Sequence, residues 1–319
     1  MSFHKSIGGF FSLENTPENK DLHPYSLKLN SARNALRLII REHSIGRIFL
    51  PFYTCPVVWD VVLKEGCSIV PYDVDINLRP IINTYEVSDY FVYTNYFGIC
   101  DNEVRKLYRR LGGKLIVDNS QAFFSSPVAP LSFYSPRKFF GLPDGGLLYG
   151  VEHKQLPLDK SFGNSGHLLK QIDEGKENSY ELFKTNDDAI TDKEIGLMSP
   201  LTLFLYNRIY PDHAADIRKR NFNYLYDKLQ KNNKIKIDES SISALSYPFW
   251  SDNSSLRNYL ISNKVYVPCY WPQTNQNQCM SSPLSQELSH HIIPLPIDQR
   301  YGIEEMKIIV GLINNFLYN

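Results

Sequence analysis

The sequence predicts an α/β protein with a mainly parallel central sheet and a smaller C-terminal α+β domain. Two observations carry this prediction. Segments with the i, i+3, i+4, i+7 spacing of an amphipathic helix alternate with short apolar runs through the first half of the chain. Strands that alternate with helices in this way are typical of the crossover connections of a parallel sheet. The 319 residues suffice for two domains, which we place at residues 1–213 and 214–319.

The elements of the first half follow one another in a regular order. Ala35, Leu36 and Ile39 lie on one face of a helix that Asn30 or Ser31 caps. The next elements are a strand at 47–52, a helix from Pro56 to Gly66, strands at 67–74 and 90–97, a helix that Asp101 caps and Gly112-Gly113 end, and strands at 114–118, 131–135 and 145–151.

The second half has a weaker pattern. Residues 152–200 are polar and predict irregular structure, with a mobile stretch near 184–194. The elements expected after it are a long helix at 214–229, strands at 235–238, 243–250, 265–271 and 291–297, a helix near 256–261, and a terminal helix with Ile309, Leu312, Ile313 and Phe316 on one face.

Composition excludes several classes of function. Lys+Arg and Asp+Glu are both 34, so no basic excess favours a nucleic-acid partner. The five cysteines lack the spacing of a zinc site or a disulfide scaffold, and His290-His291 has no third ligand at useful spacing. We expect no metal. Without a signal peptide or an apolar run of membrane-spanning length, the chain is predicted to be cytoplasmic and to have no membrane partner.

Three segments with potential chemistry fall at the predicted strand ends, where parallel sheets bind ligands. They are Asn30-Ser31-Ala32-Arg33, the run at residues 117–122 with Asp118, and the run at 132–146 with Lys138. Each alone has an ordinary structural explanation, as a helix cap, a turn or a solvated charge. Their order and spacing together favour a shared site.

In that order and spacing, the segments resemble the DegT/DnrJ/EryC1/StrS family of sugar aminotransferases, which depend on pyridoxal phosphate (PLP). The matching motifs are Ser31-Ala32-Arg33-Asn34-Ala35-Leu36, Leu50-Pro51-Phe52-Tyr53-Thr54, Asp118-Asn119-Ser120-Gln121-Ala122, Ser132-Phe133 before Lys138, Pro143-Asp144-Gly145-Gly146 and Leu295-Pro296-Ile297. The resemblance covers residues 6–150 well and the rest loosely. It implies the PLP-dependent transferase fold type I, which is also the fold of aspartate aminotransferase.

The resemblance also implies the roles of the site residues. Lys138 would hold PLP as an imine, and Asp118 would keep the ring nitrogen protonated, so that the ring accepts electrons. The helix start at Ser31 offers backbone N–H groups and a positive dipole end to the phosphate, which Arg33 and Ser135 would also bind. Gln121 matches the family position near the phenolic ring oxygen. The full cofactor-binding set is Ser31, Ala32, Arg33, Tyr53, Thr54, Cys55, Asp118, Gln121, Ser135 and Lys138.

The implied reaction transfers an amino group from an amino acid, with glutamate as the expected donor, to a keto sugar. The sugar would be nucleotide-linked and destined for surface polysaccharide or related biosynthesis, and the enzyme a homodimer with shared active sites. Arg33, Arg137 or residues near Trp271 would line the rim of an anion-binding cleft.

Other functions stay open. A PLP-dependent sugar dehydratase is disfavoured because histidine replaces the lysine in that relative. A binding or regulatory protein with this fold is favoured by Cys55, which stands where the family often has a ring-stacking aromatic residue, and by the lack of an evident Asn-Tyr-Arg segment. Tyr53 or Phe52 would then stack on the ring, or Cys55 would cover it. A generic nucleotide-binding protein is disfavoured because no Gly-x-Gly-x-x-Gly or Walker-type loop is present.

Overall fold

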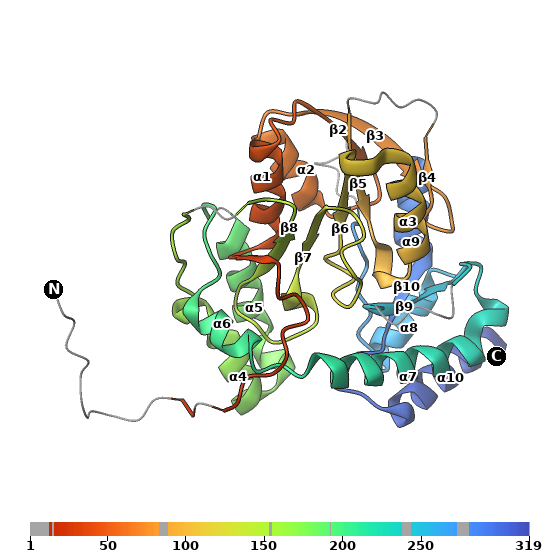
Figure 1. Ribbon diagram of the computed structural model, residues 1–319. Helices are drawn as coiled ribbons and strands as arrows, with labels where there is room; N and C mark the ends of the chain where they lie inside the picture. Colours follow the sequence, from red (N-terminus) through yellow and green to blue (C-terminus); the bar gives the residue numbers. More distant parts are fainter. Residues whose placement is uncertain are drawn as a thin grey trace.

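The computed structural model describes residues 13–14, 16–82, 89–152, 155–191, 193–237, 244–272 and 281–318. Its centre is an eight-stranded mixed sheet with helices on both faces (Figure 1). The strands are, in sheet order, β1 (Leu27–Leu29), β8 (Gly146–Tyr149), β7 (Leu131–Tyr134), β6 (Leu115–Asp118), β5 (Tyr90–Thr94), β2 (Arg47–Pro51), β3 (Ser68–Val74) and β4 (Pro80–Ile81). The five strands from β7 to β3 run parallel, while β8, β1 and β4 pair antiparallel with their neighbours. The predicted α/β class with a mainly parallel sheet is confirmed.

Side chains along the central strands alternate between two buried layers, as the two-residue period of a strand requires. In β2, Ile48 and Leu50 pack with helices α1 (Ala32–Glu42) and α2 (Pro56–Lys64). Phe49 points to the opposite layer, which contains α3 (Asp101–Leu111) and the C-terminal elements. The sheet is therefore buried on both faces, which leaves the strand ends as the place for polar side chains.

The predicted helix starts are confirmed at α1 and α2. Ser31 caps α1, because its Oγ accepts a hydrogen bond of 3.1 Å from Asn34 N. Pro56 is the first residue of α2. The predicted cap of α3 is wrong: Cys100 holds the cap position, and the Asp101 carboxylate accepts hydrogen bonds from Asn95 and Ser125 instead.

The prediction of irregular structure for residues 152–200 is also wrong. The chain forms α4 (Gly166–Glu174), α5 (Lys176–Thr191) and the start of α6 (Pro200–Tyr206) there. Hydrophobic periodicity could not reveal α5, because its buried residues include Ser179 and Asn186 while Leu182 and Phe183 stay exposed. The helix depends on polar contacts with other parts of the chain.

The C-terminal part combines helices with a two-stranded antiparallel sheet of β9 (Ser246–Trp250) and β10 (Ile292–Pro296). Its helices are α7 (Pro211–Leu229), α8 (Ser255–Ser262), α9 (Pro283–His291) and α10 (Ile303–Tyr318). The long helix begins three residues earlier than predicted, α9 was not predicted, and the described residues expected as strands at 235–237 and 265–271 form none. The boundary between residues 213 and 214 stays a prediction.

The remaining sequence expectations concern membrane spans and metal binding. Within the described ranges, no helix is long and apolar enough to cross a membrane. His290 and His291 end α9, where His291 stacks on Trp250 and its Nδ1 lies 2.7 Å from Ser251 O. Across the part of the chain that the structure describes, no group of three or more His, Cys, Asp or Glu residues is arranged to hold a metal ion.

Candidate active site

Asp118 lies at the carboxyl end of β6, on the buried floor of the candidate site. It pairs in register with Thr94 of β5, whose Oγ1 lies 3.1 Å from Thr54 Oγ1. The carboxylate is only 4% exposed and accepts a hydrogen bond of 2.8 Å from Ser120 N. Burial raises the pKa of Asp118, and the positive charge of Lys138 opposes that shift. A cation close to this carboxylate would therefore offset part of the unfavourable desolvation of its charged form.

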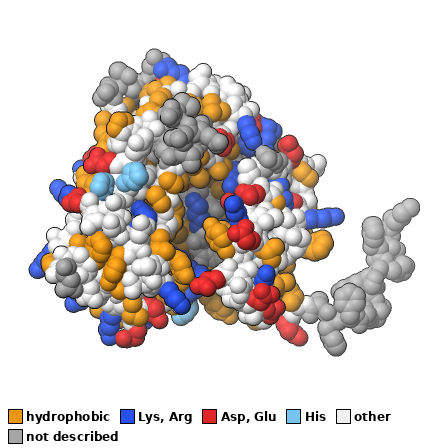
Figure 2. Space-filling view, turned by 180° about the vertical axis from the view of Figure 1, so that it is seen from behind, with side chains coloured by type: hydrophobic (Ala, Val, Ile, Leu, Met, Phe, Trp, Pro, Cys, Tyr) orange, Lys and Arg blue, Asp and Glu red, His pale blue; other side chains and the backbone are white. Residues whose placement is uncertain are grey.

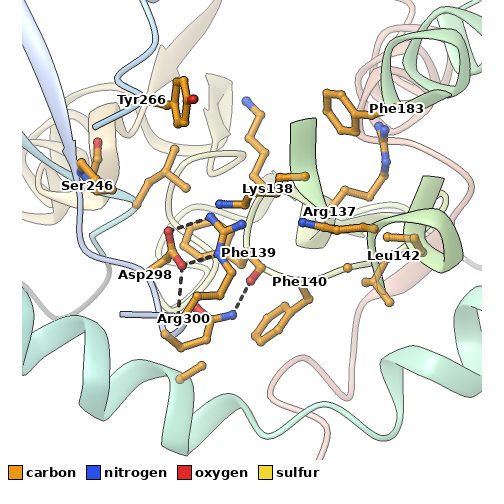
Figure 3. Close-up of a pocket in the computed structure, with 18 of the residues that line it drawn as sticks. Arg137, Lys138, Phe139, Phe140, Leu142, Phe183, Ser246, Tyr266, Asp298 and Arg300 are labelled. Atoms are coloured by element: carbon orange, nitrogen blue, oxygen red, sulfur yellow. Dashed lines mark hydrogen bonds and ion pairs between the residues drawn. The ribbon is translucent and has the colours of Figure 1, made fainter. Parts of the chain in front are cut away.

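Lys138 follows β7 in a short 3₁₀ turn (Pro136–Lys138) and lines a cavity of about 1280 Å³. Figure 3 shows its side chain stretching into the middle of this cavity, between Tyr266 and Phe183. The space-filling view shows a hollow in the molecule with hydrophobic, basic and acidic side chains around it (Figure 2). The lysine is thus open to a ligand, while its neighbour along the chain, Phe139, is buried.

The start of α1 and the chain after Lys138 lie against each other. Gly145 forms a bridge with Ser31 and donates a hydrogen bond of 2.8 Å to Asn30 O. A Cβ atom on Gly146 would lie 2.3 Å from the Ser31 carbonyl carbon and 2.4 Å from Ala32 N. No side chain fits there, so the glycine is what brings the helix start beside the lysine loop.

Gln121 carries a free donor in the floor. Its Oε1 accepts a hydrogen bond of 2.7 Å from Phe97 N, and that contact fixes the orientation of the amide. Its Nε2 is buried and has no hydrogen-bond partner among the described residues. A buried donor of this kind needs an acceptor to offset its desolvation.

Arg33, predicted to bind the phosphate, and Arg137, predicted for the rim of the cleft, share one carboxylate. Arg33 Nη2 lies 3.5 Å and Arg137 Nη2 lies 3.1 Å from the carboxylate oxygens of Asp187, on α5. Ser135, two residues before Arg137, is buried and makes no side-chain cap bond to the turn that follows it. In this arrangement Asp187 occupies the place in the ion pairs that an anion would take.

The segment after β2 divides between core and site. Tyr53 is stacked on Tyr96, with ring centroids 5.5 Å apart, and meets Trp271 edge-on at 4.7 Å. Cys55 lies within electrostatic range of Lys138, Asp118 and Arg33, and burial raises the pKa of its thiol. Of the side chains proposed to cover a ring, Cys55 is therefore near the charged residues, whereas Tyr53 belongs to an aromatic cluster.

The cavity has walls that the sequence did not reveal. One wall comes from α4 and α5, with His167, Tyr180 and Phe183, and the other from the chain around β10 and α7. Gln299 Nε2 donates a hydrogen bond of 2.6 Å to Phe139 O, which joins the second wall to the lysine loop. Of the residues predicted for the rim, Arg137 and Tyr270, the neighbour of Trp271, line this cavity, whereas Arg33 and Trp271 are not among its lining residues.

Searches against protein-family models and curated proteins found no match. Solved structures do match. A DegT DnrJ EryC1 StrS aminotransferase from Brucella abortus is 15% identical with a TM-score of 0.62, over 92% of this chain and 86% of that one. NtdA from Bacillus subtilis, solved with bound cofactor PMP, is 15% identical with a TM-score of 0.65, over 93% and 74%. The PLP-form of the putative sugar aminotransferase Spr1654 from Streptococcus pneumoniae is 16% identical with a TM-score of 0.58, over 90% and 86%.

This chain has the fold of the DegT/DnrJ/EryC1/StrS aminotransferases. The likeness extends over nine-tenths of the chain, including the loosely matching part beyond residue 150, and it confirms the fold expected from the motifs. At these identities it describes the fold alone, so the roles of individual residues depend on the geometry given above.

Proposed function

We propose that this protein is a PLP-dependent aminotransferase that acts on a keto sugar. The observation that carries the proposal is the placement of three polar groups. A buried carboxylate (Asp118) lies within electrostatic range of an amine that lines the cavity (Lys138), and three residues after Asp118 comes a buried amide donor without a partner among the described residues (Gln121). The electrostatic influence of Lys138 on Asp118 supports their closeness.

The residues fit the cofactor chemically. Asp118 would face the ring nitrogen, and a positive ring there would offset the desolvation that now raises its pKa. Gln121 Nε2 would donate to the ring oxygen, which supplies the missing acceptor. Ser31, Ala32 and the helix N-terminus would hold the phosphate through backbone N–H groups. When bound, PLP supplies an electron sink for a substrate carbon that loses a proton.

The chain itself would handle the proton. Lys138, whose side chain projects into the cavity, would act as a free amine that takes a proton from the substrate Cα and returns it. Thr54 and Thr94 support the floor beside Asp118. The walls from α4, α5 and the β10 region would limit the access of water to the reacting atoms.

We propose glutamate as the donor and a nucleotide-linked keto sugar as the acceptor, in surface polysaccharide or related biosynthesis. The charge of the cavity supports anionic substrates: its described lining includes five Lys or Arg residues and two carboxylates. The cytoplasmic location is proposed with this pathway.

A homodimer is also proposed. Helices α4 and α5 and the turn before them expose large apolar side chains, including Phe162 at 83% and Ile172 at 82%. A second copy of the chain would cover such a surface. Light scattering should give twice the chain mass, and Ile172→Asp should reduce it to the monomer mass. A monomeric wild-type protein with full activity would contradict this proposal.

The test of the function has two halves. Glutamate should convert the visible absorbance of the PLP-loaded protein to that of the amine form of the cofactor, and a nucleotide-linked keto sugar should restore it. Borohydride should attach PLP to Lys138 and to no other lysine. If PLP binds at Lys138 but no amino acid changes the spectrum, a binding or regulatory protein is the better description. The presence of Cys55 in place of a stacking aromatic residue favours that second candidate.

A further inference from the structure

Arg218 is a buried cation without a carboxylate partner. It lies on α7, its side chain is 2% exposed, and no ion pair to it exists among the described residues. Its partners are neutral oxygens. Nε donates to Gln299 Oε1 at 2.9 Å, and Nη1 donates to Leu245 O at 3.0 Å and to Ala244 O at 3.4 Å. Nη2 makes no hydrogen bond within the described part of the chain.

Asp298, whose charge acts on Arg218, forms its ion pair with another arginine. Both carboxylate oxygens of Asp298 bind Arg300, at 2.6 and 2.9 Å, as the dashed lines in Figure 3 show. Burial lowers the pKa of Arg218 to about 10, so the guanidinium is still positive at neutral pH. Burying a guanidinium without a carboxylate partner is unfavourable, and a purely structural residue could avoid that cost.

Arg218 is positioned close to the loop that contains Lys138. Arg218 and Lys138 line the same cavity. The guanidinium carbon lies 4.7 Å from the ring centroid of Phe139, the residue after Lys138. Gln299 accepts from Arg218 Nε and donates to Phe139 O, so the guanidinium is fixed relative to the lysine loop. Only Nη2 is left for a ligand that enters the cavity.

We propose that Arg218 binds an oxyanion, either a carboxylate or a phosphate group, of the substrate that reacts at Lys138. The identification of the ligand as a substrate rests on the proposed function, whereas the binding of an anion at Arg218 does not. A carboxylate would come from the amino donor, and a phosphate from a nucleotide-linked acceptor. In both cases the anion would receive a charge-assisted hydrogen bond in a cavity that excludes part of the solvent.

The test measures binding without turnover, so a failed aminotransferase assay would not decide it. The full-length chain with PLP present is titrated calorimetrically with glutarate, with pyrophosphate and with neutral glutaramide. Wild-type protein should bind at least one of the two anions more tightly than glutaramide. Arg218→Gln should weaken that binding by about tenfold or more. Loss for glutarate identifies the carboxylate source, and loss for pyrophosphate the phosphate source.

Lys184→Gln is the matched control, because it makes the same change in charge at an exposed position of α5 that does not line the cavity. It should change affinity by less than about threefold. Equal losses in the two variants, or no loss in Arg218→Gln, would overturn the proposal, as would a wild-type chain that binds neither anion. Arg218→Lys, which keeps the charge, should retain more affinity than Arg218→Gln. If neither variant folds, the anion in a wild-type crystal must lie on Arg218, and any other position overturns the proposal.

Discussion

The floor of the candidate site and its walls are built in different ways. The floor consists of residues at strand ends and at one helix start, and strand register sets their positions: Thr94 lies opposite Asp118, and Gly145 lies opposite Ser31. The walls consist of α4, α5 and the chain around β10, and side-chain contacts hold them to the floor. Asp187 meets two arginines, and Gln299 meets the lysine loop. The difference suggests that the floor determines which chemistry is possible and the walls determine which molecule reaches it.

The largest effect should come from the amine between floor and walls. Lys138→Ala removes the only group proposed to carry the proton, and turnover should fall by about a thousandfold or more. PLP should still bind through the floor, but borohydride should no longer attach it to the chain. Lys184→Ala, which removes an exposed lysine of the wall helix α5 that does not line the cavity, should leave turnover within about threefold. Similar losses in both variants would show that the comparison of floor and walls is wrong.

Asp118→Asn should give the next largest effect. The loss of a charged partner in a buried site should lower turnover by about a hundredfold, or roughly 2.7 kcal/mol at about 1.36 kcal/mol for each tenfold. Cofactor binding should persist, because the fold and the phosphate region are unchanged. Assays of turnover and of PLP absorbance check both statements. Near-normal turnover would show that Asp118 does not have the catalytic role proposed for it.

The same variant has a pH signature in the cofactor-free protein. Burial raises the folded-state pKa of Asp118, so its contribution to stability is present below the ordinary carboxyl pKa and is lost as pH rises through the raised value. Asp118→Asn should therefore unfold at a higher temperature than wild type at neutral pH, with the difference shrinking toward acid. Melting temperatures of both proteins from about pH 4 to about pH 8 test this. A variant that is less stable than wild type at neutral pH would contradict it.

The floor could be predicted from the sequence and most of the walls could not. Ser31, Asp118 and Lys138 stand beside elements whose hydrophobic period is clear, so their order along the chain indicates where the sheet puts them. Helix α5 is held by contacts such as Asn186 Nδ2 to Pro143 O, between residues far apart in sequence. No local sequence pattern predicts such a contact. Arg218 carries no signal either, since an arginine on a helix is ordinarily solvated.

Gly146 is a place where the floor depends on backbone packing alone. Gly146→Ala would put a methyl group 2.3 Å from the Ser31 carbonyl carbon, and the two segments must separate. We expect a loss of about 3 kcal/mol in the free energy of unfolding, together with weaker PLP binding. Gly163→Ala is the control, because nothing lies within 4 Å of its added methyl group. Denaturant unfolding of both variants measures the loss. If Gly146→Ala is as stable as Gly163→Ala, the contact between β8 and the start of α1 is not tight.

The smallest effect should come from the ion pairs that join wall to floor. Asp187 is 43% exposed, while the arginines it binds, Arg33 and Arg137, are 18% and 14% exposed. Asp187→Asn should change stability by less than about 1 kcal/mol, because a partly solvated pair contributes little. It should also free two cations beside the helix start and raise the affinity for PLP several-fold, with a steeper dependence on salt.

Asp188→Asn makes the same charge change one residue along α5, at an exposed position, and should alter PLP affinity much less. Fluorescence titrations with PLP at low and high salt compare the two variants. Weaker PLP binding in Asp187→Asn would mean that Asp187 orients the arginines for the phosphate instead of competing with it. The wall would then be part of the cofactor site, and the division between floor and walls would have to be drawn beyond α5.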